Sequence, residues 1–140
     1  MFTIRYATAG DEPFWFMLDS HLSRQEFERK VRDRQGYIIG DGDKPVGIMR
    51  YNLFWDEIPF LTLIHLDEPY QRKGFGQQGM IFWESEMRQL GYKMVMTSTQ
   101  VNEEAQHFYR KLGFVDRGSL FLDGTPHDQP QEMFMIKVIA

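Results

Sequence analysis

The sequence contains no cysteine, and this absence excludes several kinds of chemistry at once. A disulfide framework, a zinc site with thiolate ligands and a cysteine nucleophile all require that residue. A chain without disulfides suits a reducing compartment, so we expect a cytoplasmic protein. The 4 histidines show no metal-ligand spacing among themselves or with acidic residues, so we expect no bound metal.

Long hydrophobic runs and an excess of basic charge are also missing. The longest nearly apolar run, residues 58–66, contains Pro59 and His65 and is too short to cross a membrane. The first residues lack the apolar segment of a secretory signal. With 16 Lys and Arg against 20 Asp and Glu, the net charge is −4, which does not favour wrapping of nucleic acid. We therefore expect neither a membrane nor a nucleic acid as a partner.

The composition that is present suits a folded domain. The 140 residues are 42% hydrophobic and 15% aromatic, values typical of globular proteins. Strand and helix signals alternate along the chain, which favours an α/β or α+β fold. We expect residues 1–140 to form a single domain.

Hydrophobic periodicity and turn residues predict the individual elements. Strands are expected at 3–6, 37–39, 46–51, 58–66, 92–98, 114–122 and 133–139, and helices at 13–18, 24–34, 74–90 and 103–112. We expect Gly36 to end the second helix and Asn102 to be the N-cap of the fourth. The third helix should bury one apolar stripe and end at Gly91; the stripe consists of Met80, Trp83, Met87 and Leu90.

The segment between the strand at 58–66 and the third helix is rich in glycine. Gly74, Gly76 and Gly79 let the backbone approach a ligand closely, and the helix that follows presents its positive end. Together with Arg72 and Lys73 they predict a site for phosphate or pyrophosphate. The same glycines fit the dinucleotide fingerprint, but no acidic residue stands about 20 residues further on. A glycine-rich turn without a ligand is the open alternative.

A second block, residues 102–114, reads NEEAQHFYRKLGF and completes a pattern with QRKGFG at 71–76. With these two blocks the chain resembles the GNAT superfamily of acetyl-CoA-dependent N-acetyltransferases. That family has Q/R-x-x-G-x-G/A after its fourth strand and N-x-x-A-x-x-x-Y-x-K-x-G-F after its fifth, and every fixed position is present. One departure is that the proline of the family's Val-x-Pro turn is displaced by one position, to Pro69.

The resemblance implies a single-domain GNAT fold, with a mixed, mostly antiparallel central sheet that splits between strands four and five and is flanked by helices. It implies acetyl-CoA as co-substrate and direct acetyl transfer to a primary amine. A small-molecule amine is slightly favoured over a peptide or protein. The alternative is a non-catalytic module that binds acetyl-CoA or CoA as a sensor or interaction domain. Dimers are common in the family, so a homodimer is also expected.

The resemblance also implies roles for individual residues. Tyr109 would be the acid that protonates the leaving CoA thiolate, and the Leu66 N–H would polarise the acetyl carbonyl. Glu57 and His65 are the main candidates for the base that takes the amine proton, and a core histidine is the alternative for His65. Acetyl-CoA would be bound by residues on the fourth strand, the glycine loop and the fourth helix: Ile64, His65, Leu66, Gln71, Arg72, Lys73, Gly74, Phe75, Gly76, Gln77, Asn102, Ala105, Phe108, Tyr109 and Lys111.

Overall fold

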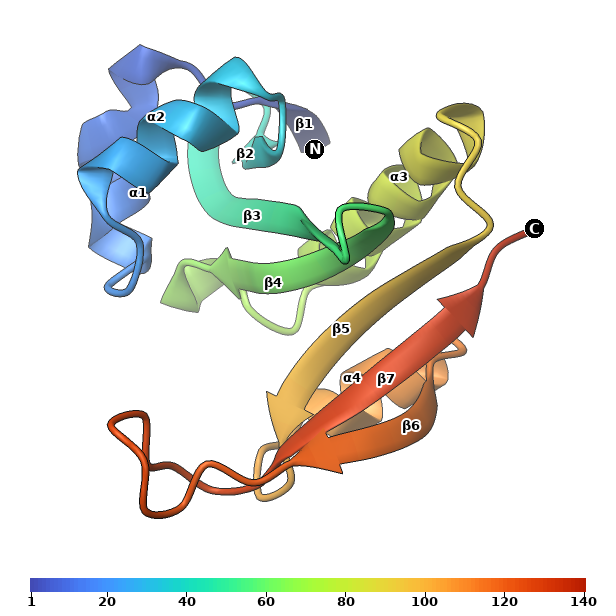
Figure 1. Ribbon diagram of the computed structural model, residues 1–140. Helices are drawn as coiled ribbons and strands as arrows, with labels where there is room; N and C mark the ends of the chain where they lie inside the picture. The colour runs from blue at the N-terminus through green and yellow to red at the C-terminus, as the bar shows by residue number, and fades with distance from the viewer. The chain divides into compact units, whose positions relative to one another are not determined.

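The computed structural model describes residues 1–140 (Figure 1). Its strands are β1 (Phe2–Tyr6), β2 (Gly36–Asp41), β3 (Lys44–Phe54), β4 (Ile58–Leu66), β5 (Met94–Gln100), β6 (Val115–Leu120) and β7 (Glu132–Val138). Its helices are α1 (Glu12–Leu18), α2 (Arg24–Arg32), α3 (Phe75–Gln89) and α4 (Ala105–Lys111), with short 3-10 turns η1 (Ala9–Asp11) and η2 (Glu68–Tyr70).

The strands form one seven-stranded sheet in the order β1-β2-β3-β4-β5-β7-β6. The β1–β2, β2–β3, β5–β7 and β6–β7 pairs are antiparallel, whereas β4 and β5 are parallel. The parallel pairing involves only Phe60 with Met96 and Leu61 with Thr97. The predicted mixed, mostly antiparallel sheet is confirmed, and the short β4–β5 pairing is where the expected split lies.

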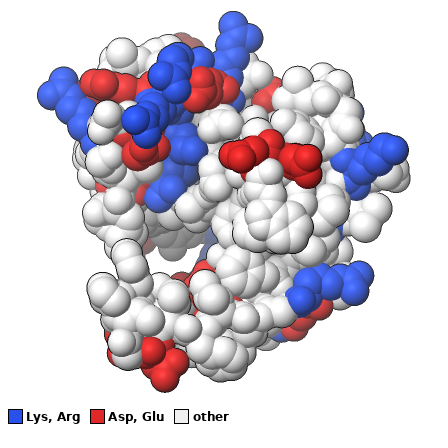
Figure 2. Space-filling model, viewed as in Figure 1, with Lys and Arg blue, Asp and Glu red and all other residues white.

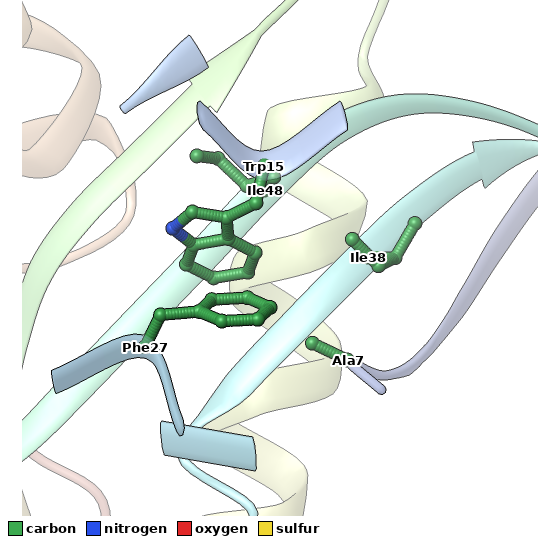
Figure 3. Packing of buried hydrophobic residues seen from close by; sticks show 5 residues of the cluster. All are labelled: Ala7, Trp15, Phe27, Ile38 and Ile48. Carbon is green, nitrogen blue, oxygen red and sulfur yellow. The ribbon is translucent and has the colours of Figure 1, made fainter. Parts of the chain in front are cut away.

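The chain divides into two compact units, residues 1–52 with 62–83 and residues 53–61 with 84–140. In the first unit, α1 and α2 cover one face of β2 and β3 (Figure 1). The rings of Trp15 and Phe27 meet there at a centroid distance of 5.3 Å and pack on Ile38 and Ile48 (Figure 3). This cluster, completed by Ala7, is the hydrophobic core between the two helices and the sheet.

The N-terminal half of α3 lies on the same unit's β2 and β3. Gly79 is needed for this packing, because a Cβ there would lie 3.0 Å from the Met49 sulfur and 3.1 Å from the Ile39 Cδ1. The predicted apolar stripe of α3 is confirmed for Met80, Trp83 and Met87, which are fully buried. No helix is both long and apolar enough to cross a membrane.

The prediction that Leu90 belongs to the buried stripe was wrong, because Leu90 is 61% exposed. The helix ends one residue earlier, in a turn where Gly91 has a φ of 91°. Gly91 N donates to the Arg88 carbonyl and Tyr92 N to the Met87 carbonyl, which is the Schellman pattern. This turn directs Leu90 away from the face that Met87 buries, while Gly91 ends the helix as predicted.

Two other helix ends also differ from the prediction. The second helix ends at Arg32 because Arg34 adopts a left-handed φ of 55°, so Gly36 begins β2 instead of ending the helix. The N-cap of α4 is Glu104, not Asn102. A Glu103 carboxylate oxygen accepts a hydrogen bond from Gln100 N at 3.0 Å, so Glu103 closes the turn that Asn102 was expected to stabilise.

In the second unit, α4 covers one face of β5, β7 and β6 (Figure 1). On β5 the alternating positions Val95, Thr97 and Thr99 are buried, and so is Met96 between them. Met133 and Met135 are the buried residues of β7. Two of the four buried β5 residues, Thr97 and Thr99, are therefore polar, which is unusual for buried positions of a strand.

Candidate active site

The glycine loop enters α3 through an irregular backbone. Arg72 and Gly74 have positive φ angles of 62° and 86°. Gln78 N donates to the Gly74 carbonyl at 3.1 Å and makes the first hydrogen bond of the helix. The N–H groups of the first turn, from Phe75 to Gln77, precede this bond and therefore point out of the helix N-terminus. Such an arrangement suits an anion.

The side chains of the loop fall into two groups. Gln71 Nε2 donates to the Leu66 carbonyl at 3.0 Å, which joins the start of the loop to the end of β4. Arg72 and Lys73 are exposed, and the Lys73 ammonium lies 6.0 Å from the centroid of the Tyr70 ring. The loop therefore combines a fixed start with two exposed positive side chains next to free N–H groups.

On β4, Ile64 is half-buried and Leu66 is buried, whereas His65 is exposed. The alternative that His65 is a core histidine is therefore wrong. His65 Nδ1 lies 2.8 Å from the Leu18 carbonyl oxygen at the end of α1. Because a carbonyl only accepts, Nδ1 carries the hydrogen and Nε2 is left as the basic nitrogen.

Glu57 lies in the turn between β3 and β4, in the other unit from His65. Its side chain is exposed, and its backbone N donates to the Phe54 carbonyl at 3.1 Å. The two residues before it, Trp55 and Asp56, have left-handed φ angles of 55° and 61°. This turn fixes the Glu57 backbone, whereas its exposed carboxylate makes no hydrogen bond or ion pair that would fix its direction.

Tyr109 is buried on α4, with only 6% of its surface exposed. Its ring packs against those of Phe108 and Phe114 at centroid distances of 5.3 and 5.7 Å. Thr97 on β5 is also buried, and its Oγ1 donates to the Leu61 carbonyl at 3.0 Å. Burial raises the pKa of Tyr109 above its ordinary value, and Thr97 opposes this rise.

The other motif residues around α4 lie nearer the surface. Ala105 and Phe108 are half-buried, whereas Asn102 and Lys111 are exposed. Thr97, which opposes the rise of the Tyr109 pKa, is a residue that the motif does not contain. A polar residue at a buried position of β5 is the signal by which Thr97 could have been found.

Charged side chains of both signs are interspersed over α2, as Figure 2 shows. They form pairs such as Arg29–Glu26 at 2.6 Å and Arg32–Asp33 at 3.0 Å. No group of three or more His, Asp or Glu side chains is arranged to hold a metal ion. The candidate residues themselves offer backbone N–H groups, a phenol, an imidazole and carboxylates.

Residues 4–114 match the acetyltransferase (GNAT) family. Ard1 from Thermoplasma volcanium has a similar structure, with a TM-score of 0.87 and 19% identity over 99% of this chain and 98% of that chain. The ribosomal-protein-S18-alanine N-acetyltransferase from Escherichia coli has a TM-score of 0.83 and 20% identity over 100% and 95% of the two chains. Arabidopsis thaliana Naa50, in complex with the bisubstrate analogue CoA-Ac-MVNAL, has a TM-score of 0.79 and 13% identity over 97% of each chain.

Comparison with curated protein sequences gives no significant match. The family match covers both motifs as far as Phe114, and the solved structures share the fold over nearly their whole length. The predicted enzyme class, an N-acetyltransferase, is thereby confirmed. The chain belongs to the GNAT family of acetyltransferases.

Proposed function

We propose that residues 1–140 act as one domain that transfers an acetyl group from acetyl-CoA directly to a primary amine. The observation that carries the proposal is the backbone of the glycine loop. Its left-handed residues, Arg72 and Gly74, precede the free N–H groups of Phe75, Gly76 and Gln77. These groups fit the pyrophosphate of acetyl-CoA, with Arg72 and Lys73 adding positive charge.

In the proposed reaction the amine nitrogen attacks the thioester carbonyl carbon. A C–N bond forms, the C–S bond breaks, and the CoA sulfur leaves as a thiolate. The Leu66 N–H would stabilise the negative charge that develops on the acetyl oxygen. Backbone groups of Ile64 and His65 would hold the pantetheine arm. No covalent enzyme intermediate is required.

Two proton transfers complete the reaction. Tyr109 would give its phenolic proton to the thiolate, and its burial keeps the phenol protonated and so able to donate. His65 is favoured over Glu57 as the base, because the bond from Nδ1 to Leu18 leaves Nε2 free to accept the amine proton. Glu57 stays the second candidate.

The remaining motif residues on and before α4 would contact the CoA chain. Asn102 is free to do so, since Glu103 closes the turn instead. Ala105, Phe108 and Lys111 would line the arm together with Gln71 from the loop. A small-molecule amine is the favoured acceptor because the net charge is −4, which attracts a cation. A cytoplasmic location and a homodimer stay predictions.

The experiment is release of CoA thiol from acetyl-CoA with a panel of small amines, peptides and proteins. We expect turnover with at least one class of amine. His65→Gln should abolish most of it if His65 is the base, whereas Glu57→Gln should do so if the base is Glu57. Acetyl-CoA could also stabilise the protein thermally while no acceptor causes release of CoA thiol. That result would contradict the enzyme and favour a CoA-binding module. Absence of stabilisation would contradict both functions.

A further inference from the structure

Asp19 is a buried carboxylate that the proposed reaction does not use. It directly follows the last residue of α1 and is only 2% exposed. Its Oδ2 accepts hydrogen bonds from Arg50 Nε on β3 at 2.8 Å and from Trp15 Nε1 on α1 at 3.1 Å. Its Oδ1 accepts from the backbone N of His21 at 3.1 Å and from that of Leu22 at 3.3 Å. One carboxylate thus joins α1, β3 and the segment that leads to α2.

These donors stabilise the charged form of Asp19. Burial alone would raise the pKa of Asp19, but the hydrogen bonds and the positive charge of Arg50 outweigh it and hold the pKa below its ordinary value. An ionised carboxylate accepts at both oxygens, so all four donors are satisfied together. Arg50 is itself only 9% exposed, so loss of the carboxylate would leave a buried cation without its counter-charge. The arrangement therefore depends on Asp19 being a carboxylate.

The peptide group between Leu18 and Asp19 connects this carboxylate to His65. Leu18 is the last residue of α1, so its carbonyl has no donor within the helix. His65 Nδ1 lies 2.8 Å from this oxygen and donates to it. At the other end of the same rigid peptide plane, Asp19 N donates to the Trp15 carbonyl at 3.0 Å. All four residues belong to the first compact unit, and the position of Asp19 determines the direction of the Leu18 carbonyl.

We propose that Asp19 is a positioning residue for His65: through the Leu18 carbonyl it holds the imidazole in the Nδ1–H tautomer, so that Nε2 stays the nitrogen that accepts the amine proton. This inference rests on the proposed function, in which His65 is the base. No covalent bond changes at Asp19, because the proton passes only from the amine to His65 Nε2.

The test compares the two ends of α1. Asp19→Asn keeps the shape, but an amide NH2 accepts no hydrogen bond, so the donors on one side of the side chain lose their acceptor. Asp11→Asn is the matched control, because Asp11 directly precedes α1, is 9% exposed and accepts two hydrogen bonds from Arg5, each at 2.8 Å. It breaks a similar ion pair at the opposite end of the helix from Leu18. Thermal unfolding establishes that both variants are folded.

The first readout is the tautomer of His65, measured without substrate by long-range 1H–15N NMR at a pH at which the ring is neutral. The signals are assigned by their loss in His65→Gln. We expect the Nδ1–H form in the unaltered protein and in Asp11→Asn, and a mixture of both tautomers in Asp19→Asn. Arg50→Lys keeps the charge but not the Nε donor, so it should give a smaller change of the same kind and decides the question if Asp19→Asn does not fold. An unaltered tautomer in the folded variants would overturn the inference.

The second readout is steady-state acetyl transfer. Asp19→Asn should lower kcat about tenfold, with KM for acetyl-CoA within about twofold, because a misplaced base loses its geometry with the amine. In the His65→Gln background the same change should have almost no further effect, since a base that is absent cannot be misplaced. An equal loss of kcat in both backgrounds would overturn the inference. Full turnover by His65→Gln would instead overturn the base named in the proposed function, and with it the catalytic part of the inference, whatever the tautomer in Asp19→Asn.

Discussion

The glycine loop and the Tyr109 cluster differ in the kind of group that each offers to a ligand. The loop, residues 71–77, is mostly exposed and offers backbone N–H groups whose directions depend on the φ angles of Arg72 and Gly74. The Tyr109 cluster, which consists of Tyr109 with Phe108 and Phe114, offers a buried phenol whose place depends on ring packing. The loop should therefore respond more strongly to a change of backbone than to a change of side chain, whereas the Tyr109 cluster should respond most to a change of side chain.

The largest effect on the reaction is expected when the Tyr109 hydroxyl alone is removed. Tyr109→Phe keeps the ring against Phe114 and removes only the hydroxyl. If the phenol is the acid, kcat should fall about 10²-fold, while KM for acetyl-CoA should stay within about twofold. Steady-state kinetics measures both values, and Tyr92→Phe is a control outside the cluster. A kcat equal to that of the unaltered protein would remove Tyr109 from the reaction.

The loop should respond to a backbone change with a loss of affinity, not of rate. Gly74 has a φ of 86°, and nothing lies within 4 Å of the place of its Cβ, so Gly74→Val acts mainly through the backbone. A left-handed conformation costs such a residue about 1–2 kcal/mol, so acetyl-CoA should bind about tenfold more weakly. Calorimetric titration measures this affinity.

The matched control for Gly74 is Gly124, which has a φ of 75° and is equally open. Gly124→Val should destabilise the fold to a similar extent and leave acetyl-CoA affinity unchanged. Equal loss of affinity in both variants would show that the effect is a general loss of stability. The loop would then have no specific part in binding.

A smaller effect is expected at the side chain that fixes the start of the loop. Gln71→Leu removes the hydrogen bond to the Leu66 carbonyl, which is worth about 1 kcal/mol. KM for acetyl-CoA should rise about threefold to fivefold with kcat preserved. Gln89→Leu, an exposed change at the end of α3, should alter neither value. If Gln71→Leu lowered kcat and left KM unchanged, Gln71 would have a role beyond fixing the loop.

The two regions also differ in how far the sequence predicts them. The strand at 58–66 was predicted with the bounds that β4 has, and the glycine loop followed from residues adjacent in the sequence. Local patterns suffice there because a turn, a helix start and an apolar run are all determined by neighbouring residues. The errors at Leu90 and Asn102 concern helix ends, where one turn decides which residue is exposed.

The Tyr109 cluster was predicted only in part. The motif identified Tyr109 but not Thr97, which opposes the rise of the Tyr109 pKa and donates to Leu61, 36 residues earlier in the chain. Such a contact depends on which strands pair and in which register, and periodicity carries no information on that. His65 shows the same limit: its bond to Leu18 spans 47 residues, and its exposure could not be inferred from the apolar strand around it.

The smallest expected effect is a dependence of stability on alkaline pH. Burial raises the pKa of Tyr109 above the ordinary value of 10.0, so the folded protein holds the phenolic proton more tightly than the unfolded chain does. The free energy of unfolding should therefore fall as pH rises above about 10. Tyr109→Phe has no proton to lose, so its stability should fall less steeply in that range. Urea unfolding at several alkaline pH values measures the free energy of unfolding of both proteins. The titration of all other groups cancels in the difference between the two. If the free energy of unfolding fell equally steeply with pH in both proteins, the phenol would ionise as readily in the folded protein as in the unfolded chain. Burial of Tyr109 would then have no electrostatic effect that distinguishes it from the exposed loop.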